Sequence, residues 1–244
     1  MFSRHLNILL FFLGAFYGAS ARSKDFDLLI FTQRWPNTIC TMWKEESPSH
    51  SCALPSDKSE WTIHGLWPTQ FHRMGPMFCD PSRPFDPSAL IPLEDQLKEK
   101  WIDIEYGRES YGLWQHEWNK HGTCAAQLPE LNTEEKYFGE GLALLSQYDM
   151  KNVLASSNIL PGSNYAASDL FNAVLQVLGA HPVIVCRKDR ETGDSYLFEI
   201  RICFDKSLEL IDCDQVTEYP TNCGDSEDVI YPADVSSDYN AISV

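Results

Sequence analysis

The pattern of apolar and polar positions predicts strands near both ends of the chain. Short continuous apolar runs indicate buried strands, and alternation of apolar with polar residues indicates a half-buried strand. On this basis we expect strands at Leu28–Phe31, Trp61–Leu66, Val183–Val185 and Tyr196–Phe204. Ser207–Ile211 can return antiparallel to the last of these strands, which would place Cys203 opposite Cys213.

Apolar residues that recur every three or four positions predict helices in the middle of the chain. Leu93–Trp101 fits one amphipathic helix. Asn132 followed by Glu135 resembles a capping box, and Ser168 can cap a later helix that Gly179 ends. Such apolar stripes are typical of core packing rather than of ligand sites. Their members are Tyr137, Phe138, Leu142 and Leu145 in the first of these two helices, and Leu170, Phe171, Val174, Leu175 and Leu178 in the second.

Two segments follow neither period and are expected to be loops. Thr41–Lys58 is polar and contains several serines, and Met74–Pro92 contains five prolines. The second should be irregular because proline fixes its own backbone and lacks a hydrogen-bond donor. Strands at both ends with helices between them favour a single α+β domain over residues 22–232, built on a central, mainly antiparallel sheet.

Both termini carry features that separate them from this domain. Arg4, the apolar run Leu6–Tyr17 and the small residues Ala19-Ser20-Ala21 are typical of a signal peptide, so we expect residues 1–21 to be removed. An uncleaved signal anchor is the alternative, although the run is short for a membrane span. Residues 233–244 form an acidic tail that we expect to be solvated and flexible.

Charge and cysteine content narrow the class of protein. Without Arg4, 18 of the 19 basic residues remain against 35 acidic residues, a net charge of −17. A protein that binds long nucleic-acid duplexes needs a broad basic surface, so this composition argues against a DNA-binding module. Eight cysteines in a chain with a signal peptide suggest four disulfides, and they are not spaced as CxxC zinc pairs.

The segment HEWNKH gathers four ionisable groups on one arc of an expected helix. At about 100° per residue, Lys120 lies about 40°, Glu117 about 100° and His121 about 140° from His116. Trp118 faces the other way and can anchor the helix in the core. Zinc proteases carry H-E-x-x-H, in which histidines four residues apart align on one ion. Here the spacing is five residues, so no zinc site is expected.

A second histidine-bearing segment is WTIHGLWP, residues 61–68. Strand alternation puts His64 on the face opposite Ile63, and Trp67-Pro68 is expected to end the strand. A lone histidine on a strand is usually a core group. His64 gains a functional meaning only if His121 faces it.

Together, WTIHGLWP and HEWNKHGTC resemble the two active-site segments of the ribonuclease T2 family, in the same order and at a suitable separation. The likeness includes Gln33-Arg34-Trp35-Pro36 with Cys40 and continues through Ala125-Ala126, and more weakly to Cys223 and Val229–Pro232. It covers nearly the whole chain after the leader. The resemblance implies a secreted endoribonuclease of α+β fold that cuts single-stranded RNA and needs no metal or other cofactor.

By this resemblance, two histidines move the protons of RNA cleavage. His121 would take the proton of the ribose 2′-OH and His64 would protonate the leaving 5′-oxygen, which yields a 2′,3′-cyclic phosphate that is then hydrolysed. Lys120 and Glu117 would stabilise the phosphorane, and His116 would hold phosphate. DNA is not expected to be a substrate because it lacks the attacking hydroxyl. The need for one protonated and one neutral histidine predicts a bell-shaped pH profile, and repulsion between RNA and this acidic chain predicts an optimum below neutrality.

The resemblance also implies a disulfide pairing. The implied pairs are Cys40–Cys52, Cys79–Cys124, Cys186–Cys223 and Cys203–Cys213. Cys79–Cys124 would join the proline-rich loop to the end of the catalytic helix. Its loss should therefore reduce activity as well as stability.

Base recognition is less closely defined by the sequence. Trp67 is expected to stack on one base and Gln33 to contact the other, with low base specificity because stacking tolerates every base. Many family members have an acidic residue where this chain has Thr69, which leaves the base preference open. Phe71 and His72 either line the same pocket or cover the loop.

The main alternative to an enzyme is a secreted binding or signalling protein that keeps this fold and acts through its surface. The presence of His64, Glu117 and His121 favours the enzyme. The part of the chain after the leader contains no Asn-x-Ser/Thr sequon, and the chain has no KDEL-type end. We therefore expect secretion, with an endolysosomal lumen as the alternative, and a monomer whose partner is RNA.

Overall fold

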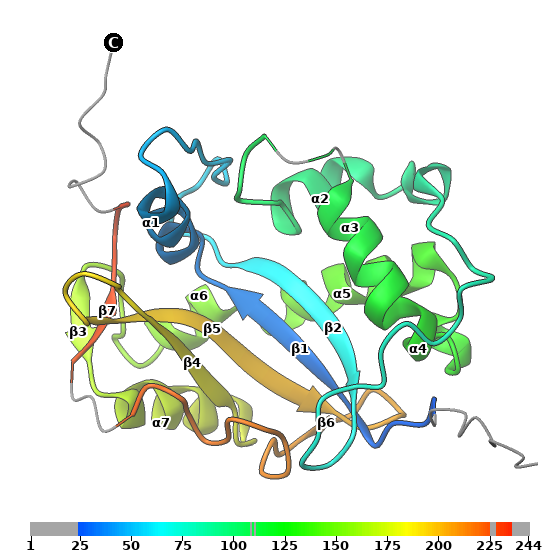
Figure 1. Ribbon diagram of the computed structural model, residues 1–244. Coiled ribbons are helices and arrows are strands. Elements are labelled where there is room, and N and C mark those ends of the chain that lie inside the picture. The colour runs from blue at the N-terminus through cyan, green and yellow to red at the C-terminus, as the bar shows by residue number, and fades with distance from the viewer. Residues whose placement is uncertain (1–23, 108, 110, 225–227, 236–244) are drawn as a thin grey trace, which may run out of the picture.

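A seven-stranded sheet forms the centre of the protein, and helices flank it (Figure 1). The computed structural model describes residues 24–107, 109, 111–224 and 228–235. The strands run in the order β2-β1-β5-β7-β3, while β4 and β6 pair with β5, and every pairing is antiparallel except that of β5 with β7. Their bounds are β1 Leu28–Arg34, β2 Thr62–Thr69, β3 Ser163–Tyr165, β4 Val183–Lys188, β5 Ser195–Phe204, β6 Leu210–Ile211 and β7 Val229–Tyr231. The expected α+β class with a mainly antiparallel sheet is confirmed.

The apolar run of β1 is continuous because both of its faces are covered. Leu29 and Phe31 belong to the main core, whereas Leu28 and Ile30 belong to a smaller cluster on the opposite face. Alternate residues of a strand point to opposite faces, so a strand buried on both sides has no polar alternation.

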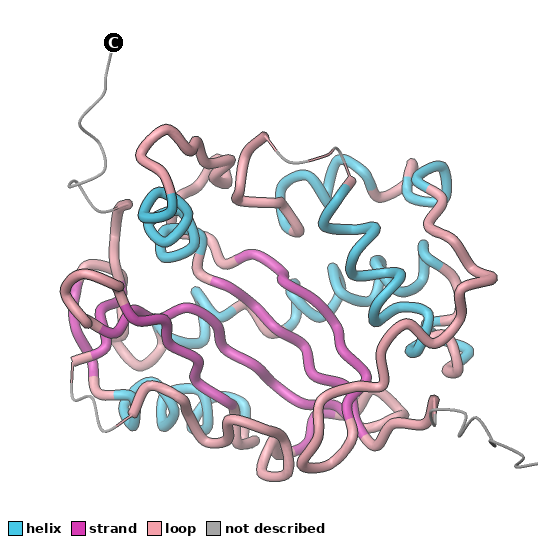
Figure 2. The backbone as a smooth tube through the Cα atoms, viewed as in Figure 1, coloured by secondary structure: helices cyan, strands magenta, loops and turns pink. Residues whose placement is uncertain are grey.

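Three helices, α5, α6 and α7, lie on one face of the sheet, as Figures 1 and 2 show, and their buried apolar side chains belong to the main core. The helices α2, α3 and α4 lie beyond β2, and α1 lies near one end of the sheet (Figure 1). The α-helical bounds are α1 Pro36–Glu46, α2 Glu94–Lys100, α3 Gly112–Glu117, α4 Thr123–Ala125, α5 Glu134–Gln147, α6 Met150–Ala155 and α7 Ala167–Leu178. A π-helical turn, Trp118–Gly122, joins α3 to α4, and 3₁₀ turns span Pro87–Leu90 and Pro129–Leu131.

The expected helices are present, but two of their expected caps are wrong. The N-cap of α5 is Thr133 rather than Asn132, and the Thr133 side chain accepts a hydrogen bond from the backbone N–H of Lys136. The N-cap of α7 is Ala166, so Ser168 lies inside the helix. Gly179 ends α7 in the left-handed conformation, as expected.

The sequence-based limits of two other elements are also corrected. Residues 41–46, expected to be loop, belong to α1, because Pro36 is pre-set for the first turn of a helix and the buried Ile39 anchors it. Strand β2 does not end at Trp67-Pro68 but continues to Thr69, which pairs with Leu28. β2 keeps only β1 as a partner in this sheet order, so proline is tolerated on its free edge.

All eight cysteines are paired, and the four pairs are those implied by the resemblance. They are Cys40–Cys52, Cys79–Cys124, Cys186–Cys223 and Cys203–Cys213. Such complete pairing fits an oxidising compartment. None of the helices in the described part of the chain combines the length and the apolar character that a membrane crossing requires.

The expectations for the two termini fall largely outside the described residues. The signal peptide, residues 1–21, and residues 236–244 of the tail lie there. Residues 233–235 are described, and they are not free of the domain. The carbonyl of Ala233 accepts a hydrogen bond from the Asn37 amide at 2.9 Å, and Val235 packs beside Ile39 and Cys40, so the domain holds the start of the expected tail.

Candidate active site

His64 sits at an irregularity in β2 that aims its side chain. Thr32 of β1 pairs with Gly65, yet the next residue, Gln33, pairs with Ile63, so His64 is the extra residue of a β-bulge. Bulges bend a strand and redirect a side chain, and they are frequent beside active sites. The indole N–H of Trp101 donates to the His64 carbonyl at 2.9 Å, which fixes the backbone there.

A buried carboxylate holds the His64 ring. The Nδ1 atom of His64 lies 2.6 Å from Glu199 Oε1, and Arg201 donates to the other oxygen of Glu199 through Nη2 at 2.9 Å. Burial alone would raise the pKa of Glu199, but His64 and Arg201 outweigh it and hold that pKa at about 2. An ionised Glu199 accepts hydrogen bonds only, so the proton of a neutral His64 ring lies on Nδ1. The Nε2 atom is then the nitrogen that remains for proton transfer.

The second histidine segment is not the continuous α-helix that the angular argument assumed. The chain leaves α3 after Glu117 and forms the π turn Trp118–Gly122 before α4. A π turn has i→i+5 hydrogen bonds, so side chains five residues apart diverge less than on an α-helix. The expected angle of 140° between His116 and His121 assumed a regular α-helix, and that assumption is wrong.

The anchoring role expected of Trp118 is confirmed. Trp118 is buried in the main core, and its indole N–H donates to the carbonyl of Arg83 at 3.1 Å. A Cβ atom on Gly122 would lie 2.3 Å from the Trp118 ring, so the turn requires glycine at that position.

The Trp67 ring lies close to both histidines and joins the strand to the helix. Its ring centre is 5.0 Å from that of His64 and 5.4 Å from that of His121, and its N–H donates to Glu117 Oε2 at 2.7 Å. A Cβ atom on Gly65 would lie 2.0 Å from the Trp67 nitrogen and 2.3 Å from Glu117 Oε2. The absence of a side chain at Gly65 is thus needed to form the Trp67–Glu117 bond.

The four ionisable groups of the helix differ in burial. Glu117 and His121 are buried, while Lys120 Nζ lies 3.5 Å from His116 Nε2 at the open side. Burial, reinforced by the charges of Lys120, His116 and His64, holds the pKa of His121 well below its usual value. Burial likewise raises the pKa of Glu117 and lowers that of His116. A neutral His121 whose buried Nδ1 meets no hydrogen-bond partner within the described residues can accept a proton.

A cleft of about 890 Å³ lies beside this site. His64, His116 and Glu117 line it, and so does Arg34 at the end of β1. Gln33 points away from the cleft: it is fully buried, its amide N–H donates to the Tyr148 carbonyl, and its carbonyl accepts from the Met150 N–H. The base contact expected of Gln33 stays a prediction that this burial does not support, because neighbouring strand residues face opposite sides and Arg34 takes the cleft side.

The other residues considered for base recognition lie as follows. Trp67 is 8% exposed, with its ring engaged in the contacts above, so base stacking on it stays a prediction. Thr69 is buried, and its hydroxyl donates to the Trp67 carbonyl at 3.1 Å. Phe71 and His72 are exposed on the following turn, and neither they nor Trp67 line the cleft, so both expectations for them stay predictions.

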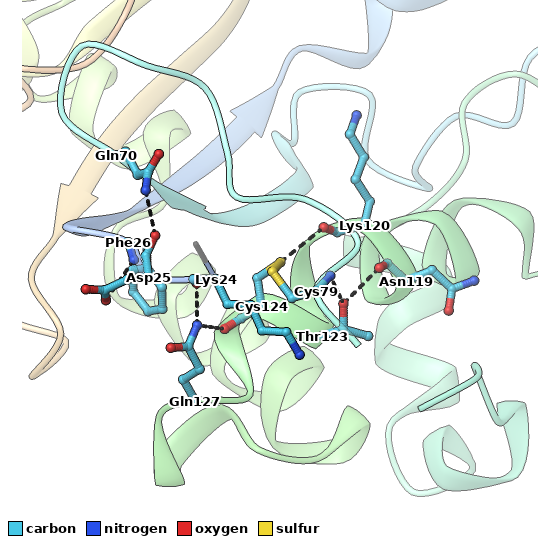
Figure 3. Close-up of a disulfide and its surroundings, with 10 residues drawn as sticks. All are labelled: Lys24, Asp25, Phe26, Gln70, Cys79, Asn119, Lys120, Thr123, Cys124 and Gln127. Carbon is cyan, nitrogen blue, oxygen red and sulfur yellow. Dashed lines mark hydrogen bonds between the residues drawn. A yellow bond between two sulfur atoms is a disulfide. The ribbon is translucent and has the colours of Figure 1, made fainter. Parts of the chain in front are cut away.

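The Cys79–Cys124 disulfide ties the proline-rich loop to the catalytic helix. Beside it, the Phe78 N–H donates to the Lys120 carbonyl at 2.9 Å and the Cys79 N–H donates to the Thr123 hydroxyl at 3.2 Å. Figure 3 shows this link, with the Lys120 side chain pointing away from the disulfide. The loop therefore supports the backbone of the helix without covering its functional face.

A possible metal-ligand cluster lies elsewhere in the described part of the chain. His181, Asp212 and Asp214 bring their ligand atoms within 4.8 Å of one another, at an open surface. His181 Nδ1 already lies 2.7 Å from Asp214 Oδ1, and none of the three lines the cleft. The groups around His64 and His121 offer no comparable cluster among the described residues.

Comparison with known proteins agrees with this geometry. Residues 26–213 match the family model described as the ribonuclease T2 family. The chain is similar to ribonuclease Oy of Magallana gigas (38% identical, covering 86% of this chain and 97% of the relative) and to extracellular ribonuclease LE of Solanum lycopersicum (34%, covering 78% and 82%). It also superimposes on the crystal structure of human RNase T2 with a TM-score of 0.71, at 32% identity, covering 85% of this chain and 99% of the other.

The chain therefore belongs to the ribonuclease T2 family, and it is an endoribonuclease of that family. The expectation of an RNA-cutting enzyme is confirmed at this level.

Sequence reasoning missed three residues of the site: Arg34, Glu199 and Arg201. Glu199 and Arg201 fall on polar positions of an alternating strand, where side chains are expected to face solvent. The sequence offered one indication, because a glutamate and an arginine two residues apart lie on the same face of a strand and can form an ion pair. Which histidine they serve depends on the sheet order.

Proposed function

We propose that this chain cuts single-stranded RNA by metal-independent transesterification, through a 2′,3′-cyclic phosphate that it then hydrolyses. The observation that carries the proposal is the placing of both His64 and His121 beside the Trp67 ring, in opposite electrostatic surroundings. His64 contacts a buried carboxylate, whereas His121 is buried near cationic groups. Such a pair can act as general acid and general base.

The roles of general base and general acid are assigned to the two histidines from these surroundings. His121, kept neutral by burial, takes the proton of the 2′-OH as that oxygen attacks phosphorus. His64, with Glu199 on Nδ1, protonates the departing 5′-oxygen through Nε2. Lys120 at the open side neutralises charge on the phosphorane, Glu117 bonded to Trp67 supports it, and His116 holds the phosphate. The two histidines exchange roles when water opens the cyclic ester.

We infer an optimum below neutrality. The low pKa of His121 keeps it in the basic form under mildly acidic conditions, while acid protonates part of the 35 carboxylates that repel RNA. Low base specificity is part of the same proposal, since the polar groups that line the cleft are suited to phosphate and ribose more than to base edges. Secretion and a monomeric state are also proposed; paired cysteines and an extracellular relative support the first.

The decisive experiment incubates the mature protein with RNA and with DNA of the same sequence between pH 4 and 8, with and without EDTA. We expect cleavage of RNA alone, 2′,3′-cyclic phosphate ends and no effect of EDTA. EDTA inhibition or equal cleavage of DNA would overturn the proposal.

The His121→Ala variant tests the base. It should lose about 10²- to 10⁴-fold in kcat, the usual contribution of a general base, while its thermal unfolding stays close to that of the parent. His181→Gln is the matched control, because it removes a histidine from the acidic surface cluster and should leave kcat unchanged. Full activity in His121→Ala would mean that the base is misassigned.

A further inference from the structure

The cleft continues well past the two histidine segments. Its volume of about 890 Å³ lies near the upper end of the roughly 300–1,000 Å³ of ordinary small-molecule sites, so one phosphate and its ribose leave part of it free. At the far end it is bordered by α1 and by the end of β4. The lining residues there include Trp43, Glu45, Glu46, Arg187, Lys188, Arg190 and Phe198.

Three of these residues form what we call the basic strip: Arg187, Lys188 and Arg190. All three are exposed, while Cys186, just before them, is bonded to Cys223 and fixes the strand. The Arg187 guanidinium lies 4.9 Å from the centre of the Phe198 ring, which positions it over the cleft floor. Arg190 lies 3.7 Å from Glu46 but is 72% exposed, a geometry that leaves most of its donors for a ligand.

The charge of the strip contrasts with that of the whole chain. The protein carries a net charge of −16 with only 19 basic residues, yet three of them follow one side of this cleft within four positions. Asp103, Glu105 and Glu109 also line the cleft, and so do Glu45 and Glu46 of α1, of which Glu46 lies 3.7 Å from Arg190. A polyanion entering it is therefore attracted along the β4 side and repelled by these carboxylates, which favours one strand in one path.

The direction of that strand follows from the histidines. The cleft is lined by His64 and His116, whereas His121 and Trp67 are not among its lining residues. In the proposed reaction His64 serves the leaving 5′-oxygen. The nucleotides attached to that oxygen, on the 3′ side of the cut, must then run into the cleft.

We propose that the basic strip binds the backbone phosphate on the 3′ side of the nucleotide that leaves. This site rests on the proposed function and extends it: the enzyme would prefer RNA with at least one further phosphate beyond the scissile one. Contacts to phosphates position a strand without reading its sequence, which agrees with low base specificity.

The test compares three substrates that share one scissile bond: UpA, UpA with a 3′-phosphate and UpA with a 5′-phosphate. One charge-assisted hydrogen bond, at about 1.5–3 kcal/mol, corresponds to about a 10- to 150-fold change. The parent should therefore gain at least about tenfold in kcat/KM from the 3′-phosphate and little from the 5′-phosphate. The variant R187Q/K188Q/R190Q should lose that gain while cutting UpA itself at the parental rate.

A matched control removes three exposed or half-exposed lysines elsewhere, in K58Q/K151Q/K206Q. It loses the same charge and should keep the gain from the 3′-phosphate. Persistence of the gain in the strip variant, or an equal gain from a 5′-phosphate, would overturn the proposal. If the parent cuts none of these substrates, the proposed function fails instead. Calorimetric binding of the uncleavable 2′-deoxy analogue with a 3′-phosphate still decides the site, because the strip variant should bind it at least about tenfold more weakly than the control does.

Discussion

Glu199 reaches His64 from β5, although β1 lies between β5 and the strand that carries the histidine. The β-bulge at His64 directs the histidine ring toward Glu199. Arg201 donates a hydrogen bond to the other oxygen of the Glu199 carboxylate. At the residue scale, the proposed acid is held by a buried carboxylate that does not line the cleft. Glu199 is a positioning residue for the proposed acid.

Changing Glu199 to glutamine should lower kcat by about 10²-fold, the lower end of what a general acid contributes, because an amide can hold the wrong tautomer of His64. The pH–rate profile should lose or displace the limb that reports the acid, which a purely structural defect would leave in place. Glu218→Gln is the control, as Glu218 also pairs with Arg201 but does not contact His64. An unchanged profile in Glu199→Gln would refute the positioning role.

At the scale of elements, the π turn Trp118–Gly122 sets the relation between the helix and the strand. The turn begins at the buried Trp118, which anchors it in the core. Cys124, which follows the turn in α4, is fixed by a disulfide. Because Gly122 contacts the Trp118 ring, the glycine and the tryptophan act as one packing unit.

Gly122→Ala should therefore cost about 1–3 kcal/mol in the free energy of unfolding and reduce kcat, since the ring or the backbone must move. Urea unfolding and single-substrate kinetics measure the two effects. Gly139→Ala in α5 is the matched substitution: its Cβ would meet nothing nearer than 3.7 Å, and it should stabilise the helix by roughly 0.5–1 kcal/mol. Equal stability of both variants would show that the turn tolerates a side chain.

At the scale of the whole molecule, two carboxyl groups change the free energy of unfolding in opposite directions as the pH rises. Burial and the neighbouring Asp189 raise the pKa of Glu45 to about 7. Its contribution to the free energy of unfolding is therefore present below about pH 4.5 and is lost as the pH rises through 7. The pKa of Glu199 is held at about 2, so its contribution is present above about pH 4.5 and is lost as pH falls toward 2. Both contributions are best retained near pH 4.5.

Glu45 should accordingly lower the midpoint of thermal unfolding as the pH rises from 5 to 8, so the parent should lose more over that range than Glu45→Gln does. Glu45→Gln should raise the midpoint at pH 8 by about 2–4 °C and leave it nearly unchanged at pH 5. Glu46→Gln next to it, which removes only the exposed pair with Arg190, should keep the parental pH dependence. A Glu45→Gln shift of the same size at pH 5 and at pH 8 would contradict this account.

The sequence by itself determined the α+β class, most of the strands and helices, and the two histidine segments, because periodicity and local motifs are written in neighbouring residues. Its errors at Thr133, Ala166 and residues 41–46 concern element ends, where several nearby residues compete for the same cap or first turn. Only the tertiary structure decided that Gln33 faces the core, that His64 lies on a bulge and that Glu199 holds it, since each depends on which strand lies beside which. A one-residue change of register turns a strand's side chains to the other face, and no local pattern reports it.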